Sequence, residues 1–299
     1  MQNPSILTTL SGDIARAVEL GAQVVVAVNG RPRVPSSGVL WRPDVVVTTD
    51  HNLKRDEDIT VTLPDGRSIP ATLAGRDAGS DLAVLRLGET VGEAAKQVAD
   101  ASLRTGSLVL AVGRRVENGI TATLGVVNAV GGAWRTWRGG QIDRFIRPDT
   151  TIYTGFSGGA LIDTEGQVIG INSSALARGA AITIPASTVT RVTDILLARG
   201  RVGRGFIGVG MHPVRLPDGR IGLVILSLEP NGPAAKAGIV VGDVMLSING
   251  QAVQDTDQVQ AYLGPETVGK TVTIGILRGG APMDIPVTAA ERPVRGRCG

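Results

Sequence analysis

The chain has 299 residues, a length typical of about two domains. Hydrophobic residues make up 42% and charged residues 19%, which excludes compositional disorder. No apolar run approaches the ~20 residues of a membrane span. The single cysteine, Cys298, excludes an intrachain disulfide and a CxxC or Cys-rich zinc site, and two histidines, His51 and His212, exclude a histidine-rich cluster. We therefore expect neither a metal nor a cofactor.

The net charge of +3 is not concentrated in a block of like charges, nor in a basic stripe that alternates with aromatic residues. We therefore expect no nucleic-acid partner. The first ten residues lack a charged segment followed by an apolar one, so the sequence predicts no secretory signal here. A cytoplasmic location and a removed leader both stay open.

Short strand signals dominate the first two thirds of the chain. Ser11 is expected to cap a helix over 12–20 that stops at Gly21. Strands are then predicted over 23–28, 38–40, 45–49, 59–63, 68–73 and 82–87, and again over 107–112, 120–130, 142–146, 160–162, 168–171 and 180–184. Because these strands follow one another without intervening helices, they favour β-barrels over a parallel sheet.

The pattern changes at Ser187, where apolar residues take helical spacing until Gly200. A Gly- and Arg-rich stretch over 201–205 follows and is interpreted as a linker. The remaining unit has strand signals over 206–209, 222–228, 244–248, 271–277 and 283–288, and helical ones over 234–237 and 256–263. The predicted organisation is a domain over 1–200, the linker, a domain over 206–292 and a flexible tail over 293–299.

Ser157 is the first candidate for chemistry. It is followed by Gly158 and Gly159, with Gly155 two residues before it, and an apolar strand comes next. Glycines allow a tight turn that exposes the hydroxyl and turns backbone N–H groups toward one point, as in an oxyanion hole. Alone the motif is weak, since such turns are commonly structural.

A serine nucleophile needs a base, and the base needs an orienting carboxylate. His51 follows the apolar strand 45–49 and is the only histidine before His212, and Asp81 opens the strand 82–87. The order His51, Asp81, Ser157 is that of the chymotrypsin-type double barrel and differs from that of subtilisins and α/β-hydrolases.

With these motifs the chain resembles the HtrA/Deg-type serine proteases, a trypsin-like double barrel followed by a PDZ domain. Further matching segments are 36–39, 65–67, 80–87, 156–161 and 166–172, then 204–209, 230–238, 242–244 and 247–250. The implied fold is mainly β: a chymotrypsin-like double β-barrel and a PDZ domain. The implied activity is endopeptidase cleavage of unfolded or misfolded polypeptides.

The resemblance also implies residue roles. His51 would be the general base and acid, Asp81 its orienting group and Ser157 the nucleophile, with the backbone N–H groups of Gly155 and Ser157 as the oxyanion hole. Ile152 falls where the family lines its substrate pocket, which implies aliphatic preference, and the segment Asn172–Ala175 would pair with a substrate strand.

In the PDZ-like unit, the resemblance places the peptide-binding loop at Phe206, Ile207, Gly208 and Val209. Such loops capture a C-terminal carboxylate with backbone N–H groups and add the peptide as a strand. The family also implies a cell-envelope location. The aromatic N-terminal residues that join its trimers are absent here, so a homo-oligomer stays open.

The chain departs from the family at residues 153–156, where Phe156 replaces a polar residue. We expect packing to hold this loop, with the Gly155 N–H turned away from the oxyanion position until a ligand shifts it. The competing interpretation is a catalytically silent peptide-binding or adaptor protein that keeps the protease fold. The stretch 131–140, with Trp134 and Trp137, is interpreted as a mobile regulatory loop, and His212 as a surface loop residue.

Overall fold

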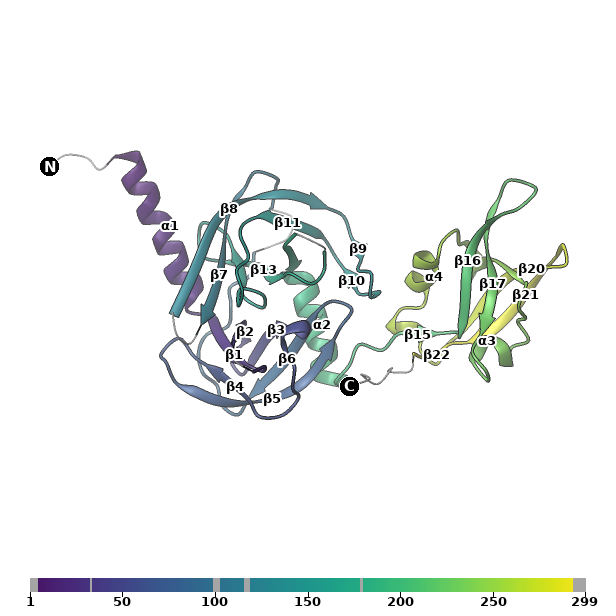
Figure 1. Cartoon of the computed structure of the whole chain (residues 1–299), viewed down its shortest axis with the longest axis horizontal. Coiled ribbons are helices and arrows are strands. Elements are labelled where there is room, and N and C mark those ends of the chain that lie inside the picture. Colours follow the sequence, from purple (N-terminus) through teal and green to yellow (C-terminus); the bar gives the residue numbers. More distant parts are fainter. Residues whose placement is uncertain (1–4, 33, 99–102, 116–118, 178–179, 293–299) are drawn as a thin grey trace. The chain divides into compact units, whose positions relative to one another are not determined.

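The computed structural model describes residues 5–32, 34–98, 103–115, 119–177 and 180–292. The predicted tail 293–299, with Cys298, lies outside this range. The chain divides into two compact units, Met1–Val202 and Gly203–Gly299 (Figure 1).

The first unit begins with a closed six-stranded antiparallel barrel of the order β1-β2-β3-β6-β5-β4. Its strands are β1 (Val25–Asn29), β2 (Ser36–Arg42), β3 (Val45–Thr49), β4 (Ile59–Thr62), β5 (Ser68–Asp77) and β6 (Leu82–Leu87). The barrel interior is filled by Val, Leu and Ile side chains of these strands. Two predicted strands, β3 and β6, have the expected bounds, and they pair with each other from Val45↔Arg86 to Thr49↔Leu82.

The second barrel closes in the order β11-β14-β13-β12-β7-β8. Its strands are β7 (Leu108–Arg115), β8 (Gly119–Gly131), β11 (Phe145–Asp149), β12 (Ala160–Ile162), β13 (Val168–Ser173) and β14 (Ile182–Pro185). The mainly β double barrel predicted from the sequence is therefore confirmed.

A separate hairpin of β9 (Trp134–Arg135) and β10 (Gln141–Ile142) lies between β8 and β11. The single strand expected over 142–146 is thus wrong, and the stretch 131–140 contains a hairpin arm. The strand breaks because Asp143 turns toward helix α2 (Ala186–Arg199): its N–H donates to Thr188 Oγ1 at 2.8 Å and its carboxylate pairs with Arg191.

Helix α1 (Ile6–Ala22) begins before the predicted start at Gly12. Ser5, and not Ser11, is its N-cap, with the Ser5 hydroxyl accepting from the Thr8 N–H at 3.2 Å. Figure 1 shows the start of α1 standing away from the barrels, and Ile6 and Leu7 are exposed. Within the described ranges, no helix combines the length and apolar content needed to cross a membrane.

The second unit is a sheet of the order β16-β17-β18-β20-β21, with β19 (Gln251–Ala252) paired to β18. Its strands are β16 (Val209–Arg215), β17 (Ile221–Leu228), β18 (Val244–Ile248), β20 (Thr271–Arg278) and β21 (Ala281–Thr288). Strand β15 (Gly205–Phe206) precedes this sheet in the chain and pairs with β22 (Ala290–Glu291), which follows it. A 3-10 turn, η3 (Pro265–Thr267), lies before β20. Helices α3 (Pro233–Lys236) and α4 (Thr256–Tyr262) complete the unit.

Two expectations for this unit are corrected. The strand predicted over 206–209 is interrupted at Gly208, whose φ of +77° is incompatible with a continuous strand. His212 lies on strand β16, paired with Val224, and not in a loop, although its side chain is exposed.

A buried ion pair holds the turn before β18. Asp243 is 1% exposed, and its carboxylate accepts two hydrogen bonds from the Arg278 guanidinium, each of 2.8 Å, and one from the Val240 N–H at 2.9 Å. The hydrogen bonds from Arg278 lower the pKa of Asp243 below its ordinary value, against the opposing effect of burial. A lowered carboxyl pKa contributes stability above the unfolded-state pKa, which is lost as the pH falls through the folded-state value.

Replacing Asp243 with Asn should therefore destabilise the second unit by about 2 kcal/mol at neutral pH, because Arg278 loses a charged partner. The difference from the wild type should start to shrink below about pH 4, where the Asp243 carboxyl of the unfolded chain is protonated, and should shrink further as the pH falls through the lower folded-state pKa. Hydrogen exchange followed by mass spectrometry of the full chain measures this for β20 peptides.

The matched control is Asp218→Asn, which removes an exposed carboxylate that pairs with Arg220. It should leave exchange in β20 unchanged. Equal effects of the two substitutions would contradict the assigned role of Asp243.

Candidate active site

His51 lies on a one-turn 3-10 helix, η1 (Asp50–Asn52), directly after β3. Arg76, at the end of β5, fixes this turn: its Nε donates to Asp50 Oδ1 at 2.6 Å and its Nη2 to the Leu53 carbonyl at 2.6 Å. Asp50 is buried, so the ion pair with Arg76 compensates an otherwise costly charge. The imidazole therefore stands on a turn that is tied to the first barrel.

Asp81 directly precedes β6 and is 2% exposed, with a φ of +58° that is uncommon outside glycine. Asp81 Oδ2 lies 2.8 Å from His51 Nδ1, and Oδ1 accepts from the His51 backbone N–H at 2.9 Å. A third donor, the hydroxyl of Ser173 on β13, reaches Oδ2 at 2.6 Å. The carboxylate thus binds groups from both barrels, and it favours the His51 tautomer that carries the proton on Nδ1.

Ser157 sits in the turn before β12, and the glycines around it are needed for space. A Cβ added to Gly158, whose φ is +91°, would lie 2.1 Å from the Ser37 carbonyl oxygen. A Cβ on Gly159 would lie 2.2 Å from the Val112 carbonyl oxygen. The backbone at Ser157 is therefore pressed against strands of both barrels, which fixes its position.

The Ser157 hydroxyl has a partner that the sequence did not indicate. Ser157 Oγ lies 3.0 Å from Ser174 Oγ and accepts a hydrogen bond from the Ser174 N–H at 3.2 Å. Between the described residues His51 and Ser157, no side-chain hydrogen bond is formed. The structure therefore brings His51 and Asp81 into direct contact and leaves Ser157 bound to the segment after β13.

Residues 153–156 form a turn in which the Phe156 N–H donates to the Tyr153 carbonyl at 3.0 Å. With Gly155 at a φ of +95°, this is a type II turn, whose central amide carries the Gly155 N–H. Within the described residues, the N–H groups of Gly155 and Ser157 donate to no protein acceptor. Both are thus available to a ligand oxygen.

Phe156 is 3% exposed and packs with the apolar core of the second barrel. Packing of Phe156 therefore holds this loop as expected, but not alone, and the expected orientation of the Gly155 N–H stays a prediction. The Gly155 carbonyl adds a polar anchor, since it accepts from the Ser37 N–H at 3.1 Å and from the Ser37 hydroxyl at 2.6 Å.

The two residues assigned to the substrate pocket have different surroundings. Ile152 is half-buried against the core of the second barrel. The Asn172 side chain is fully buried: its Nδ2 donates to the Ala160 carbonyl at 2.9 Å, and its Oδ1 accepts from Thr183 Oγ1 at 2.9 Å. Its backbone carbonyl accepts from the Gly158 N–H at 2.9 Å, so Asn172 supports the serine turn from within the barrel.

Positive charge lies beside this turn. Arg31 donates from Nη1 to Asn52 Oδ1 at 2.6 Å, and the Arg115 side chain passes 3.5 Å from the Cβ position of Gly155. Burial lowers the pKa of Arg31, and the nearby charge of Arg115 lowers it further. In the described part of the chain, no metal-binding cluster of three or more His, Cys, Asp or Glu residues occurs.

The hairpin of β9 and β10 supports the loop that leads into Asp81. The Thr136 hydroxyl donates to the Gly79 carbonyl at 2.7 Å, and a Cβ on Gly140 would lie 2.2 Å from the same carbonyl oxygen. On the other side, the Asp77 carboxylate accepts from the N–H groups of Gly79 and Ser80 at 3.1 and 2.9 Å. The loop is therefore held from two directions.

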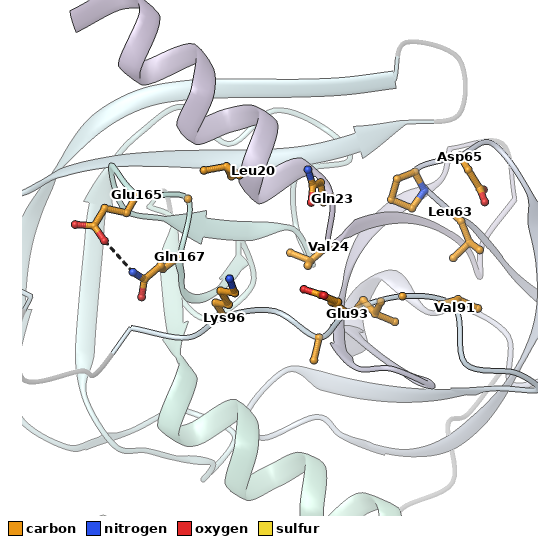
Figure 2. Close-up of a pocket in the computed structure, with 15 residues that line it drawn as sticks. Leu20, Gln23, Val24, Leu63, Asp65, Val91, Glu93, Lys96, Glu165 and Gln167 are labelled. Carbon is orange, nitrogen blue, oxygen red and sulfur yellow. Dashed lines mark hydrogen bonds between the residues drawn. The ribbon is translucent and has the colours of Figure 1, made fainter.

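A cavity of about 400 Å³ lies elsewhere in the first unit, between the end of α1 and the loops around Leu63 and Val91 (Figure 2). Glu93 and Lys96 line it, and the hydrogen bond between Glu165 and Gln167 lies at its side. None of His51, Asp81 and Ser157 contributes to its lining.

In the second unit, the predicted peptide-binding residues form the connection from β15 into β16. The carbonyls of Ile207 and Gly208 are occupied, since they accept from the N–H groups of Ala234 and Glu229, both at 2.8 Å. Among the described hydrogen bonds, the N–H groups of Ile207 and Gly208 have no acceptor. Phe206 lies in β15, and Val209 begins β16, an edge strand of the sheet.

Comparison with known families defines the class of protein. Residues 36–171 match the trypsin-like peptidase domain, and residues 205–288 match the PDZ domain. The serine endoprotease from Yersinia pestis superposes with a TM-score of 0.80 at 30% identity, covering 98% of this chain and 100% of that one. The HtrA-type protease AlgW, solved with a decapeptide, gives a TM-score of 0.79 at 27% identity, covering 94% and 99%.

The chain belongs to the HtrA/Deg-type family of trypsin-like serine proteases with a PDZ domain. It is 35% identical over 279 residues to a probable periplasmic serine endoprotease DegP-like of Brucella suis, covering 88% of this chain and 54% of that protein. The periplasmic serine endoprotease DegP of Escherichia coli K12 is 33% identical over 264 residues, covering 83% and 55%. The chain thus spans about half the length of these curated relatives.

Sequence reasoning missed the supporting contacts of four residues at the site: Arg76, Thr136, Ser173 and Ser174. Arg76 and Thr136 act through loops far from them in the sequence, and no local pattern marks such contacts. Ser173 and Ser174 were included in the predicted substrate-pairing segment Asn172–Ala175, but their hydrogen bonds to Asp81 and Ser157 were not predicted.

Arg76→Met should destabilise the first unit by about 3 kcal/mol, because it leaves the buried Asp50 carboxylate without its partner. It should also lower kcat, because the turn that carries His51 loosens. Tryptophan fluorescence reports unfolding of this unit alone, since Trp41, Trp134 and Trp137 are the three tryptophans of the chain.

Arg67→Met is the control, because Arg67 pairs with the exposed Asp65 at the surface. It should change neither the unfolding midpoint nor kcat. If Arg76→Met behaved in the same way, Arg76 would not be needed to hold η1.

Proposed function

We propose that this protein is a serine endopeptidase that cleaves unfolded or misfolded polypeptides through His51, Asp81 and Ser157. The observation that carries the proposal is the buried Asp81 carboxylate, which binds both the ring and the backbone of His51. The family assignment supports the same chemistry, and the glycine turn fixes the position of Ser157 between the two barrels.

In the proposed reaction, the peptide carbonyl carbon is attacked by Ser157 Oγ while His51 Nε2 accepts the hydroxyl proton. The N–H groups of Gly155 and Ser157 stabilise the resulting oxyanion, and Arg115 adds positive charge nearby. His51 then protonates the leaving amine, and the acyl-enzyme remains. Water, deprotonated by His51, attacks the ester and releases the carboxylic acid and the free serine.

This sequence of steps requires Ser157 Oγ to turn from Ser174 to His51 before attack. Catalytic hydrogen bonds commonly tighten when substrate binds. We propose that the substrate main chain pairs with the segment that starts at Asn172, and that the aliphatic Ile152 lines the pocket for the residue before the cut. The preferred residue there is a small or medium aliphatic one.

Ser157→Ala should abolish cleavage of unfolded casein while leaving the fold unchanged, because the nucleophilic oxygen is removed. Cleavage is measured by peptide mapping and the fold by tryptophan fluorescence. Labelling by a fluorophosphonate should disappear in parallel. Residual cleavage by pure Ser157→Ala protein would refute the proposed mechanism.

For the second unit, we propose capture of peptide C-termini by the loop of Phe206, Ile207, Gly208 and Val209. The available N–H groups of Ile207 and Gly208 suit a carboxylate. Strand β16 is a free sheet edge that a peptide could extend, and Val209, Met211 and Tyr262 of α4 are partly buried apolar residues beside it.

A peptide that ends in an apolar residue with a free carboxylate should bind the full-length Ser157→Ala protein at least about tenfold more tightly than its C-terminal amide, since charged hydrogen bonds contribute 1.5–3 kcal/mol. Isothermal titration calorimetry measures both Kd values. The inactive background prevents cleavage of the peptide. Equal affinities would exclude the carboxylate loop.

The alternative is a catalytically silent adaptor that keeps the protease fold and binds peptides. One observation favours it: the Ser157 hydroxyl is bound to Ser174 and not to His51. Fluorophosphonate labelling separates the two functions, because an adaptor without an activated serine would resist labelling even with long peptide ligands present.

A further inference from the structure

The segment directly after β13 binds two members of the proposed triad through adjacent serines. Ser173 Oγ donates to Asp81 Oδ2 at 2.6 Å, whereas Ser174 contacts Ser157 through both its hydroxyl and its N–H. Ser173 thus supports the carboxylate that orients the base. Ser174 supplies the nucleophile with a partner other than the base.

This segment is folded on itself. The Ala175 N–H donates to Ser173 Oγ at 3.1 Å, a local turn that uses the donor an extended strand would offer to a neighbour. The ladder between β13 and β14 ends at Ser173↔Ile182, so Ser174 and Ala175 lie beyond it. One donor of the edge along which a substrate strand would pair, the Ala175 N–H, is therefore already used by the chain itself.

We propose that Ser174 is a positioning residue that holds the Ser157 hydroxyl away from His51 until a peptide pairs along residues 173–175. This inference rests on the proposed function. A pairing peptide takes over the Ala175 N–H and extends the segment, which withdraws the Ser174 N–H and hydroxyl. Ser157 is then free to rotate about its Cα–Cβ bond toward His51.

The arrangement makes activation depend on the length of the substrate. A ligand too small to pair with the segment encounters mostly molecules in which Ser157 is bound to Ser174. Its apparent rate of reaction is therefore the intrinsic rate multiplied by the small fraction of molecules in which Ser157 is released. A longer peptide pairs with the segment, and part of the free energy of pairing releases the serine. Pairing therefore raises kcat instead of lowering KM alone.

The test compares Ser174→Ala and Ser174→Thr with the wild type. Ser174 is exposed, so loss of its hydroxyl leaves no buried cavity. The first probe is a small alkyl fluorophosphonate: Ser157 Oγ forms a bond to phosphorus, fluoride leaves and His51 takes the proton. The second probe is a peptide long enough to pair with residues 173–175.

Ser174→Ala should label about fivefold faster than the wild type, the factor expected for one hydrogen bond of ordinary net strength. Its kcat for the long peptide should change less than about twofold, because pairing has already released the serine. Ser174→Thr keeps the hydroxyl and should label like the wild type. Ser187→Ala, an exposed serine on α2, is the matched control and should change neither rate.

The inference would be overturned if the wild type and Ser174→Ala were labelled at equal rates. It would also be overturned if Ser174→Ala reacted more slowly than the wild type with both probes, and by the same factor. A measurement on the wild type alone gives a second test. Adding two residues before the cut in a short peptide should raise kcat about fivefold, whereas a change in KM alone would contradict the inference. Failure of the proposed function looks different: neither probe would react with the wild type.

Discussion

The carboxylate of Asp81 is the group on which the arrangement of the site depends. It is buried, and its three hydrogen-bond donors come from both barrels: the backbone and ring of His51 from the first and the hydroxyl of Ser173 from the second. A buried carboxylate that lost these donors would be strongly destabilising. The site therefore exists only when the barrels meet in this register, and the carboxylate that orients His51 also joins the two halves of the unit.

Close backbone approach makes that register achievable in a chain with only 3% aromatic residues. One apolar cluster contains Val39, Val47 and Val84 of the first barrel together with Val112 and Ile171 of the second. At the site itself, Gly158 and Gly159 let the serine turn approach the strands to distances that no side chain would permit. Small and β-branched residues thus replace large ones as the means of fitting the barrels together.

The sequence predicted the fold class, because short apolar strands and turn residues are local signals. The order of His51, Asp81 and Ser157 along the chain also predicted that the three act together, and in the structure His51 and Asp81 are in direct hydrogen-bond contact. The break within the strand expected over 142–146 was not predicted, because its cause is a hydrogen bond from Asp143 to Thr188 in a distant helix. For the same reason the contacts of Arg76 with Asp50 and of Ser174 with Ser157 could not be predicted: they depend on three-dimensional neighbours, and neither residue type stands out in its own segment.

The contact between Gly79 and Gly140 limits how this chain can diverge. A side chain at position 140 would meet the Gly79 backbone at 2.2 Å and push the hairpin from the loop that leads to Asp81. Trp137 lies in the loop 137–139, which the hydrogen bond from the Thr136 N–H to the Gly140 carbonyl closes; its side chain is 73% exposed and meets no such restriction. Insertions and substitutions can therefore accumulate within the loop 137–139 while Thr136 and Gly140 stay fixed. A descendant of this protein could acquire a new surface there without disturbing the carboxylate of Asp81.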